Sequence, residues 1–147
     1  MNLSLENKHA LVCGASSGIG RASALALAAQ GACVTVLARR EELLDELLPL
    51  LEEAGAAKAY KLVADVADRD DLQNKITTHL DQAGPIHIWL NNTGGPAGGP
   101  LVHAKVEELE QAFSRHVLAA QTLLQLLLPG MQEAGYGRII NIISTSV

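Results

Sequence analysis

Three glycines with a defined spacing, Gly14, Gly18 and Gly20, are the residues of this sequence best suited to binding phosphate groups. They lie between the apolar run 9–13 and an alanine-rich segment with helical periodicity, which predicts a turn from a strand into a helix. The first glycine allows the tight bend, the second lets the backbone approach a pyrophosphate, and the third lets the helix pack close to the strand. The free N–H groups of the helix N-terminus attract the phosphates. Helix packing alone also favours glycines, but in this context they predict dinucleotide binding.

Other polar residues follow the remaining apolar runs in the same way. Arg39 and Arg40 follow 32–38, Asp65 follows 59–64, Asn91–Gly94 follow 86–90, and Ser144 follows 139–143. Because the carboxyl ends of parallel strands meet at one edge of a sheet, we expect these side chains near the glycine turn. Each also has a structural alternative. The arginines can be a solvated start of a helix, Asp65 can cap a turn, the asparagines can connect loops, and Ser144 can cap a strand.

The elements that must position these residues alternate along the chain. Apolar runs predict strands at 9–13, 32–38, 59–64, 86–90 and 139–143. Helical periodicity predicts helices at 19–30, 41–54, 68–83 and 106–131. Asp68 is expected to cap the third helix, and Pro49 is expected to kink the second.

This alternation predicts an α/β fold: a doubly wound parallel sheet of Rossmann type, with five strands and four intervening helices. Hydrophobic residues make up 48% of the chain and aromatic residues only 3%, so small and aliphatic side chains must fill the core. A length of 147 residues without a low-complexity linker fits one domain. We expect residues 1–147 to be a dinucleotide-binding domain that stops after its fifth strand and is an incomplete portion of a longer domain.

The spacing of the glycines at 14, 18 and 20 differs from the commoner Gly-x-Gly-x-x-Gly, and here the sequence resembles the short-chain dehydrogenase/reductase family. Asp65-Val66 is similar to the family's pair that contacts the adenine, and Asn91–Gly94 is similar to its Asn-Asn-Ala-Gly motif. Residues 137–144 are similar to the segment that ends in the family's catalytic serine. The four motifs occur in the family's order, so the resemblance covers nearly the whole chain. Cys13 departs from it, because the family usually has a threonine there.

The resemblance implies an active site in which a serine stabilises the substrate oxygen, a tyrosine is the general acid and base, a lysine assists the tyrosine, and an asparagine completes a proton relay. It places the serine at Ser144, with Ser146 as the alternative if the register shifts. It places His116 at the asparagine position, where an imidazole can pass protons near neutral pH or can be purely structural. The tyrosine and lysine are expected beyond the end of this sequence. Tyr60 and Tyr136 lack a lysine four residues later and are not substitutes.

The residue that follows the second strand selects between NAD and NADP in such folds. A carboxylate there accepts hydrogen bonds from the ribose 2′-OH of NAD and repels the 2′-phosphate of NADP. Here no carboxylate follows Ala38, Arg39 can hold a phosphate through paired N–H donors, and Ser16 can add a hydroxyl. NADP is therefore the expected cofactor, and NAD is less favoured. The residues expected to bind it are Gly14, Ser16, Ser17, Gly18, Ile19, Gly20, Arg39, Arg40, Asp65, Val66, Asn92 and Gly94.

Composition argues against several other classes. The net charge of −5 offers no basic field for a nucleic acid. The polar N-terminus lacks the order of a secretory signal, and the apolar run 117–131 is interrupted by polar residues and a proline, so no membrane partner is expected. Cys13 and Cys33 lack ligand-like spacing, as do the histidines outside the site, so we expect reduced thiols, no metal and a cytoplasmic location.

Two functions fit these observations. The first is an NADP(H)-dependent oxidoreductase that transfers a hydride between the cofactor and a small carbonyl or alcohol substrate. The alternative is a non-catalytic NADP-binding module or redox sensor, which the His116 substitution favours. The helix predicted at 106–131 carries more apolar residues than one sheet face needs, and the resemblance implies that such a surface pairs with another subunit. A homodimer or homotetramer is therefore expected.

Overall fold

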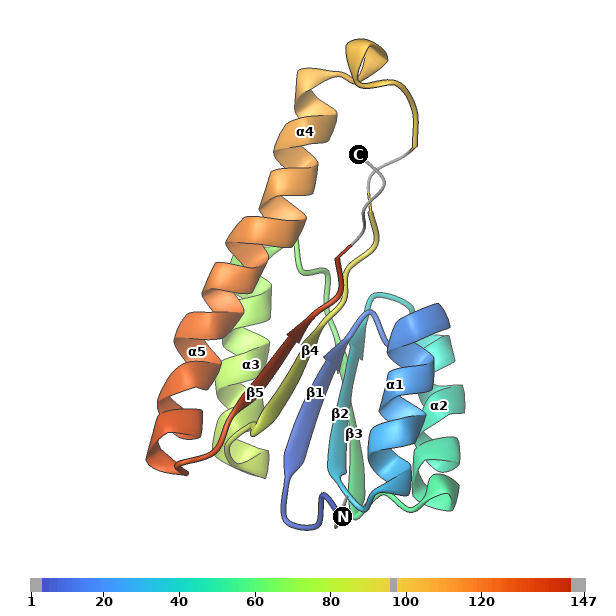
Figure 1. The fold of residues 1–147 in the computed structure, drawn as a ribbon, viewed down its shortest axis with the longest axis vertical. Helices are drawn as coiled ribbons and strands as arrows, with labels where there is room; N and C mark the ends of the chain where they lie inside the picture. Colours follow the sequence, from blue (N-terminus) through green and yellow to red (C-terminus); the bar gives the residue numbers. More distant parts are fainter. Residues whose placement is uncertain (1–3, 96–97, 144–147) are drawn as a thin grey trace.

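Five parallel strands form the centre of the computed structural model, which describes residues 4–95 and 98–143. The strands are β1 (His9–Cys13), β2 (Cys33–Ala38), β3 (Lys58–Val63), β4 (Ile88–Asn91) and β5 (Arg138–Asn141). They pair side by side in the order β3-β2-β1-β4-β5, and each pairing is parallel (Figure 1). The predicted doubly wound sheet is thus confirmed, with strand ends within two residues of those expected.

Helices cover both faces of this sheet. Helices α1 (Gly18–Ala29) and α2 (Glu41–Ala54) lie on one face, and α3 (Arg69–Ala83) and α5 (Ala119–Glu133) lie on the other (Figure 1). Alternate residues of each strand point to opposite faces, so each strand contributes to two separate apolar cores. One core joins the central strands to the alanines and leucines of α1 and α2, and the other joins them to α3 and α5 around Trp89.

Local signals explain where the helices begin and end. Asp68 caps α3 as predicted, since its Oδ1 accepts a hydrogen bond from the backbone N–H of Asp71 at 3.1 Å. Helix α2 ends at Gly55, whose φ of +117° is a left-handed conformation that favours glycine. Pro49 lies inside α2, and the helix continues through it to Ala54.

The last predicted helix departs most from expectation. It consists of α4 (Val106–Phe113), a π-helical turn η2 (Ser114–Leu118) and α5 in direct succession, and a short 3₁₀ turn η1 (Leu101–His103) precedes it. A π turn inserts an extra residue into the helix and is frequent at functional sites. The predicted helix at 106–131 is therefore present, but its side chains change phase at the π turn.

The strand order fixes where a ligand can bind. Strand β1 lies between β2 and β4, so the chain passes to opposite sides of the sheet after β1 and β3, and a crevice opens at the carboxyl ends of β1 and β4. In Figure 1 helix α4 rises past this end of the sheet. Strand β5 is one of the two edge strands and is exposed along its length. No helix in the described ranges is long and apolar enough to cross a membrane.

A buried polar cluster, made of His9, Thr35 and His79, lies between the sheet and α3. The Thr35 hydroxyl is 2.7 Å from Nε2 of His9 and 2.8 Å from Nε2 of His79, and the Tyr60 ring contacts both imidazoles. The hydroxyl has one hydrogen to donate and two lone pairs to accept with, so it can hydrogen-bond to both neutral imidazoles, in roles that depend on their tautomers. Burial lowers the pKa of His9 to about 4, helped by His79 and His87, and burial also lowers the pKa of His79.

Candidate functional site

The glycine turn after β1 is packed so tightly that side chains are excluded at two of its three glycines, Gly14 and Gly20. Gly14 has a φ of +63°, and a Cβ on it would overlap the carbonyl oxygen of Asn92. A Cβ on Gly20 would overlap the carbonyl oxygen of Gly14, so this glycine lets α1 lie against the turn. Gly18 has a φ of +55°, and a Cβ there would meet no described atom within 4 Å, so the space in front of the helix N-terminus stays open.

The serines of the turn contact an arginine from the end of β2. Nη2 of Arg40 donates to Oγ of Ser16 at 3.0 Å and to Oγ of Ser17 at 3.3 Å. Ser17 is the N-cap residue that precedes α1, but its hydroxyl makes no capping bond to the helix. The backbone N–H groups in the first turn of α1 are therefore left for another acceptor, and Arg40 adds a positive charge beside them.

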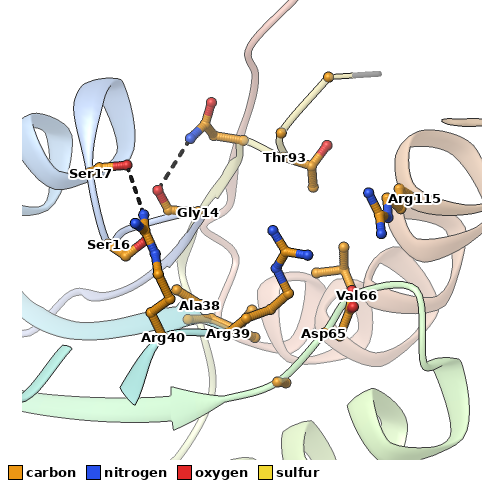
Figure 2. Close-up of a pocket in the computed structure, with 15 residues that line it drawn as sticks. Gly14, Ser16, Ser17, Ala38, Arg39, Arg40, Asp65, Val66, Thr93 and Arg115 are labelled. Carbon is orange, nitrogen blue, oxygen red and sulfur yellow. Dashed lines mark hydrogen bonds between the residues drawn. The ribbon is translucent and has the colours of Figure 1, made fainter. Parts of the chain in front are cut away.

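These residues line a pocket of about 310 Å³ (Figure 2). Its wall is made of Gly14, Ser16, Ser17, Leu37, Ala38, Arg39, Arg40, Ala64, Asp65, Val66, Asn92, Thr93, Gly94, Gly95 and Arg115. Three of these residues are arginines and one is a carboxylate, so the pocket is locally positive although the whole chain carries −5. Such a pocket suits an anionic ligand with flat apolar parts.

Most of the residues expected to bind the cofactor come together in this pocket. Ile19 instead lines a neighbouring groove. Gly18 and Gly20 shape the glycine turn but line neither the pocket nor that groove. Arg39 was predicted to hold the phosphate, whereas Arg40 is the arginine that reaches the serines. The role of Arg39 stays a prediction.

Asp65 and Asn92 combine structural and site roles. Oδ1 of Asp65 accepts a hydrogen bond from the backbone N–H of Ala67 at 3.0 Å, so this residue stabilises the turn after β3 while it lines the pocket. The amide of Asn92 donates to the carbonyl oxygens of Cys13 and Gly14, both at 3.5 Å, and links the turn after β4 to the glycine turn. The structural alternatives for these residues thus coexist with their places in the pocket.

His116 lies in the π turn and contacts the turn after β4. Its Nδ1 is 2.6 Å from Oγ1 of Thr93, so Nε2 is the ring nitrogen left for a further hydrogen-bond partner. Both residues line a second, open groove of about 1190 Å³, which Trp89, Val117 and other apolar side chains also line. An imidazole therefore lies at the wall of a largely apolar groove, next to the pocket at the glycine turn.

The structure adds two residues that the sequence analysis did not assign. Thr93 lies within the quoted motif Asn91–Gly94, so its place was available from sequence, but its pairing with His116 was not. Arg115 lines the pocket at the glycine turn. Helical periodicity could not predict where its side chain points, because the π turn changes the helical phase. The proposed catalytic Ser144 and its alternative Ser146 lie outside the described residues.

The remaining sequence predictions concern metals and cysteines. No cluster of three or more His, Cys, Asp or Glu side chains able to hold a metal occurs in the described part of the chain. Both cysteines are free thiols, with Cys13 buried and Cys33 partly buried.

A parallel sheet of this strand order, with a glycine turn after β1, defines a Rossmann-type fold. Residues 8–147 match the family described as short chain dehydrogenase, and the chain belongs to this family. It is 36% identical over 140 residues to the ketoacyl reductase HetN of a Nostoc species, covering 95% of this chain and 48% of that protein. The chain spans about half the length of the curated relatives it matches.

Solved structures agree with this assignment. L-sorbose reductase from Gluconobacter frateurii, solved with NADPH and L-sorbose, superposes with a TM-score of 0.89 at 30% identity, covering 96% of this chain and 54% of that one. A metagenomic short-chain oxidoreductase in complex with NADP gives a TM-score of 0.88 at 34% identity, covering 97% of this chain and 63% of that one. These two structural neighbours bind NADP or NADPH.

Proposed function

We propose that this protein is an NADP(H)-dependent oxidoreductase that transfers a hydride between the cofactor and a small carbonyl or alcohol substrate. The observation that carries the proposal is the contact of Arg40 with Ser16 and Ser17, which places a guanidinium and two hydroxyls beside the glycine turn. This donor set suits a phosphate on the ribose better than a free 2′-OH. The open space at Gly18 provides the approach for the pyrophosphate.

The residues of this chain act at two places, the pocket at the glycine turn and the neighbouring groove. Arg40 and the serines hold the phosphorylated ribose, and Asp65 and Val66 bound the opposite end of the same pocket. When it is bound, the cofactor supplies or accepts the hydride. In the neighbouring groove His116, oriented by Thr93, carries a proton to or from the active site in place of the family's asparagine. Ser144 orients the substrate oxygen, as the family resemblance implies.

The protein is also proposed to form a homodimer or homotetramer. Helix α4 and the π turn expose Leu109, Phe113 and Val117, and β5 exposes Ile139 and Ile140. Apolar side chains grouped on one helix and one outer strand favour burial against another surface.

Titration of the intact protein with NADPH and with NADH tests the cofactor assignment. We expect NADPH to bind at least tenfold more tightly, since a charge-assisted phosphate contact contributes about 1.5–3 kcal/mol. Equal binding of the two, or tighter binding of NADH, would overturn the assignment. Consumption of NADPH in the presence of a panel of carbonyl compounds then separates the two functions. Binding without turnover of any member would favour the non-catalytic module.

A further inference from the structure

Arg115 occupies a position between the two hollows that no motif explains. It is partly buried and lines the nucleotide pocket, while its neighbour His116 lines the adjoining groove. Both belong to the π turn Ser114–Leu118. Successive side chains in an α-helix are separated by about 100°, and the wider π turn reduces this rotation. The π turn therefore lets two consecutive residues of one helix face neighbouring parts of the same site.

The guanidinium of Arg115 has no hydrogen bond or ion pair with any residue in 4–95 or 98–143. Arg40 differs, because its Nη2 donates to the hydroxyls of Ser16 and Ser17. A guanidinium carries five N–H donors on a rigid plane. At the wall of a pocket, such a group is available to a ligand.

The surroundings of Arg115 indicate which part of a ligand it meets. Figure 2 shows Arg115 at the end of the pocket that holds Val66 and Asp65, while Arg40 and the serines lie at the other end. Arg40 and the two serines are thus grouped away from Arg115, and Arg39 lies between them. The end near Arg115 combines apolar lining from Val66 and Ala64 with a planar cation, which suits the face of an aromatic ring.

We propose that Arg115 binds the adenine ring of the cofactor, with its guanidinium plane against the base. The inference rests on the proposed cofactor function and extends it, since it assigns a binding residue on the helix that also carries His116. Arg115 and His116 are neighbours in one π turn, so the residue that binds the base and the residue proposed to carry a proton are held by the same turn of helix. Arg115 is a specificity residue for the adenosine half of the cofactor and takes no part in proton transfer.

Three probes that share adenine but differ in phosphate test the contact: adenosine, 2′-AMP and 5′-AMP, each measured by competition with NADPH on the intact protein. Arg115→Ala should weaken all three by a common factor of about 2- to 30-fold, the range of a cation–π contact. Arg40→Ala should weaken 2′-AMP and spare adenosine. Arg115→Lys, which keeps the charge but loses the plane, should fall between Arg115→Ala and wild type.

Arg69→Ala is the matched control, because Arg69 is exposed at the start of α3 and lies outside the pocket wall. It should bind all three probes within about twofold of wild type. Unchanged binding of every probe by Arg115→Ala, or a loss confined to the phosphate esters, would overturn the adenine contact alone. Wild-type protein that binds neither NADPH nor the probes would overturn the proposed function and the role of Arg115 together.

Discussion

Acidification is expected to destabilise the fold through the buried cluster of His9, Thr35 and His79. With both imidazoles neutral, the Thr35 hydroxyl can donate to one ring and accept from the other, and the backbone at Ala83 makes a further hydrogen bond with His9. Charging His9 places a cation in a site that is 5% exposed, beside a second imidazole. No carboxylate contributes to the shift of the His9 pKa, and the backbone hydrogen bond at Ala83, which favours the charged form, is weaker than the effect of burial.

The size of the effect follows from the His9 pKa. It is about 4 in the folded protein and 6.5 in an unfolded chain, so the unfolded state binds the proton more tightly between these values. The contribution of neutral His9 to the free energy of unfolding is fully present above pH 6.5 and is lost as the pH falls towards 4. A difference of about 2.5 units corresponds to about 3 kcal/mol of unfolding free energy, and the lowered pKa values of His79 and His87 act in the same direction.

Urea unfolding of the intact protein between pH 4.5 and 8 measures this dependence. His9→Gln should cost about 1–3 kcal/mol at pH 8, because it disturbs a buried hydrogen bond, yet its stability should change less with pH than that of wild type. His103→Gln is the control, since His103 is exposed and lies outside the cluster, and it should follow wild type. A His9→Gln curve parallel to wild type across the whole range would refute the reasoning.

Three further outcomes test the site and the assembly. Arg39→Asp is expected to weaken NADPH by about 10- to 100-fold and to spare or improve NADH in cofactor titrations; equal losses for both would contradict a 2′-phosphate contact. His116→Leu is expected to lower kcat by roughly tenfold or more with little change in NADPH affinity, while His116→Asn, the family's residue, retains turnover; unchanged kcat in the leucine variant would exclude the relay. By light scattering, the protein should be an oligomer, because α4, the π turn and β5 expose apolar side chains. A monodisperse monomer would argue against this prediction.

Much of the site follows from residues that are close in sequence. The glycine turn could be predicted because Gly14 and Gly20 lie six positions apart, directly between a strand and a helix. The cap at Asp68 could also be predicted, since the bond it accepts comes from the helix it precedes. Alternation of strands and helices then determined the parallel sheet and the edge at which the polar residues gather.

Contacts between distant segments were decided only by the tertiary structure. Two adjacent arginines have the same sequence context, and only the path of the chain after β2 determines that Arg40, 24 residues from Ser16, reaches the serines. The π turn changes the helical phase before Arg115 and His116, so periodicity could not assign the hollow that each residue faces. The buried cluster joins residues 26 and 44 positions apart. Sequence alone determines local conformation and hydrophobic pattern, whereas such pairings depend on the packing of whole elements, where a small rotation of one helix exchanges one partner for another.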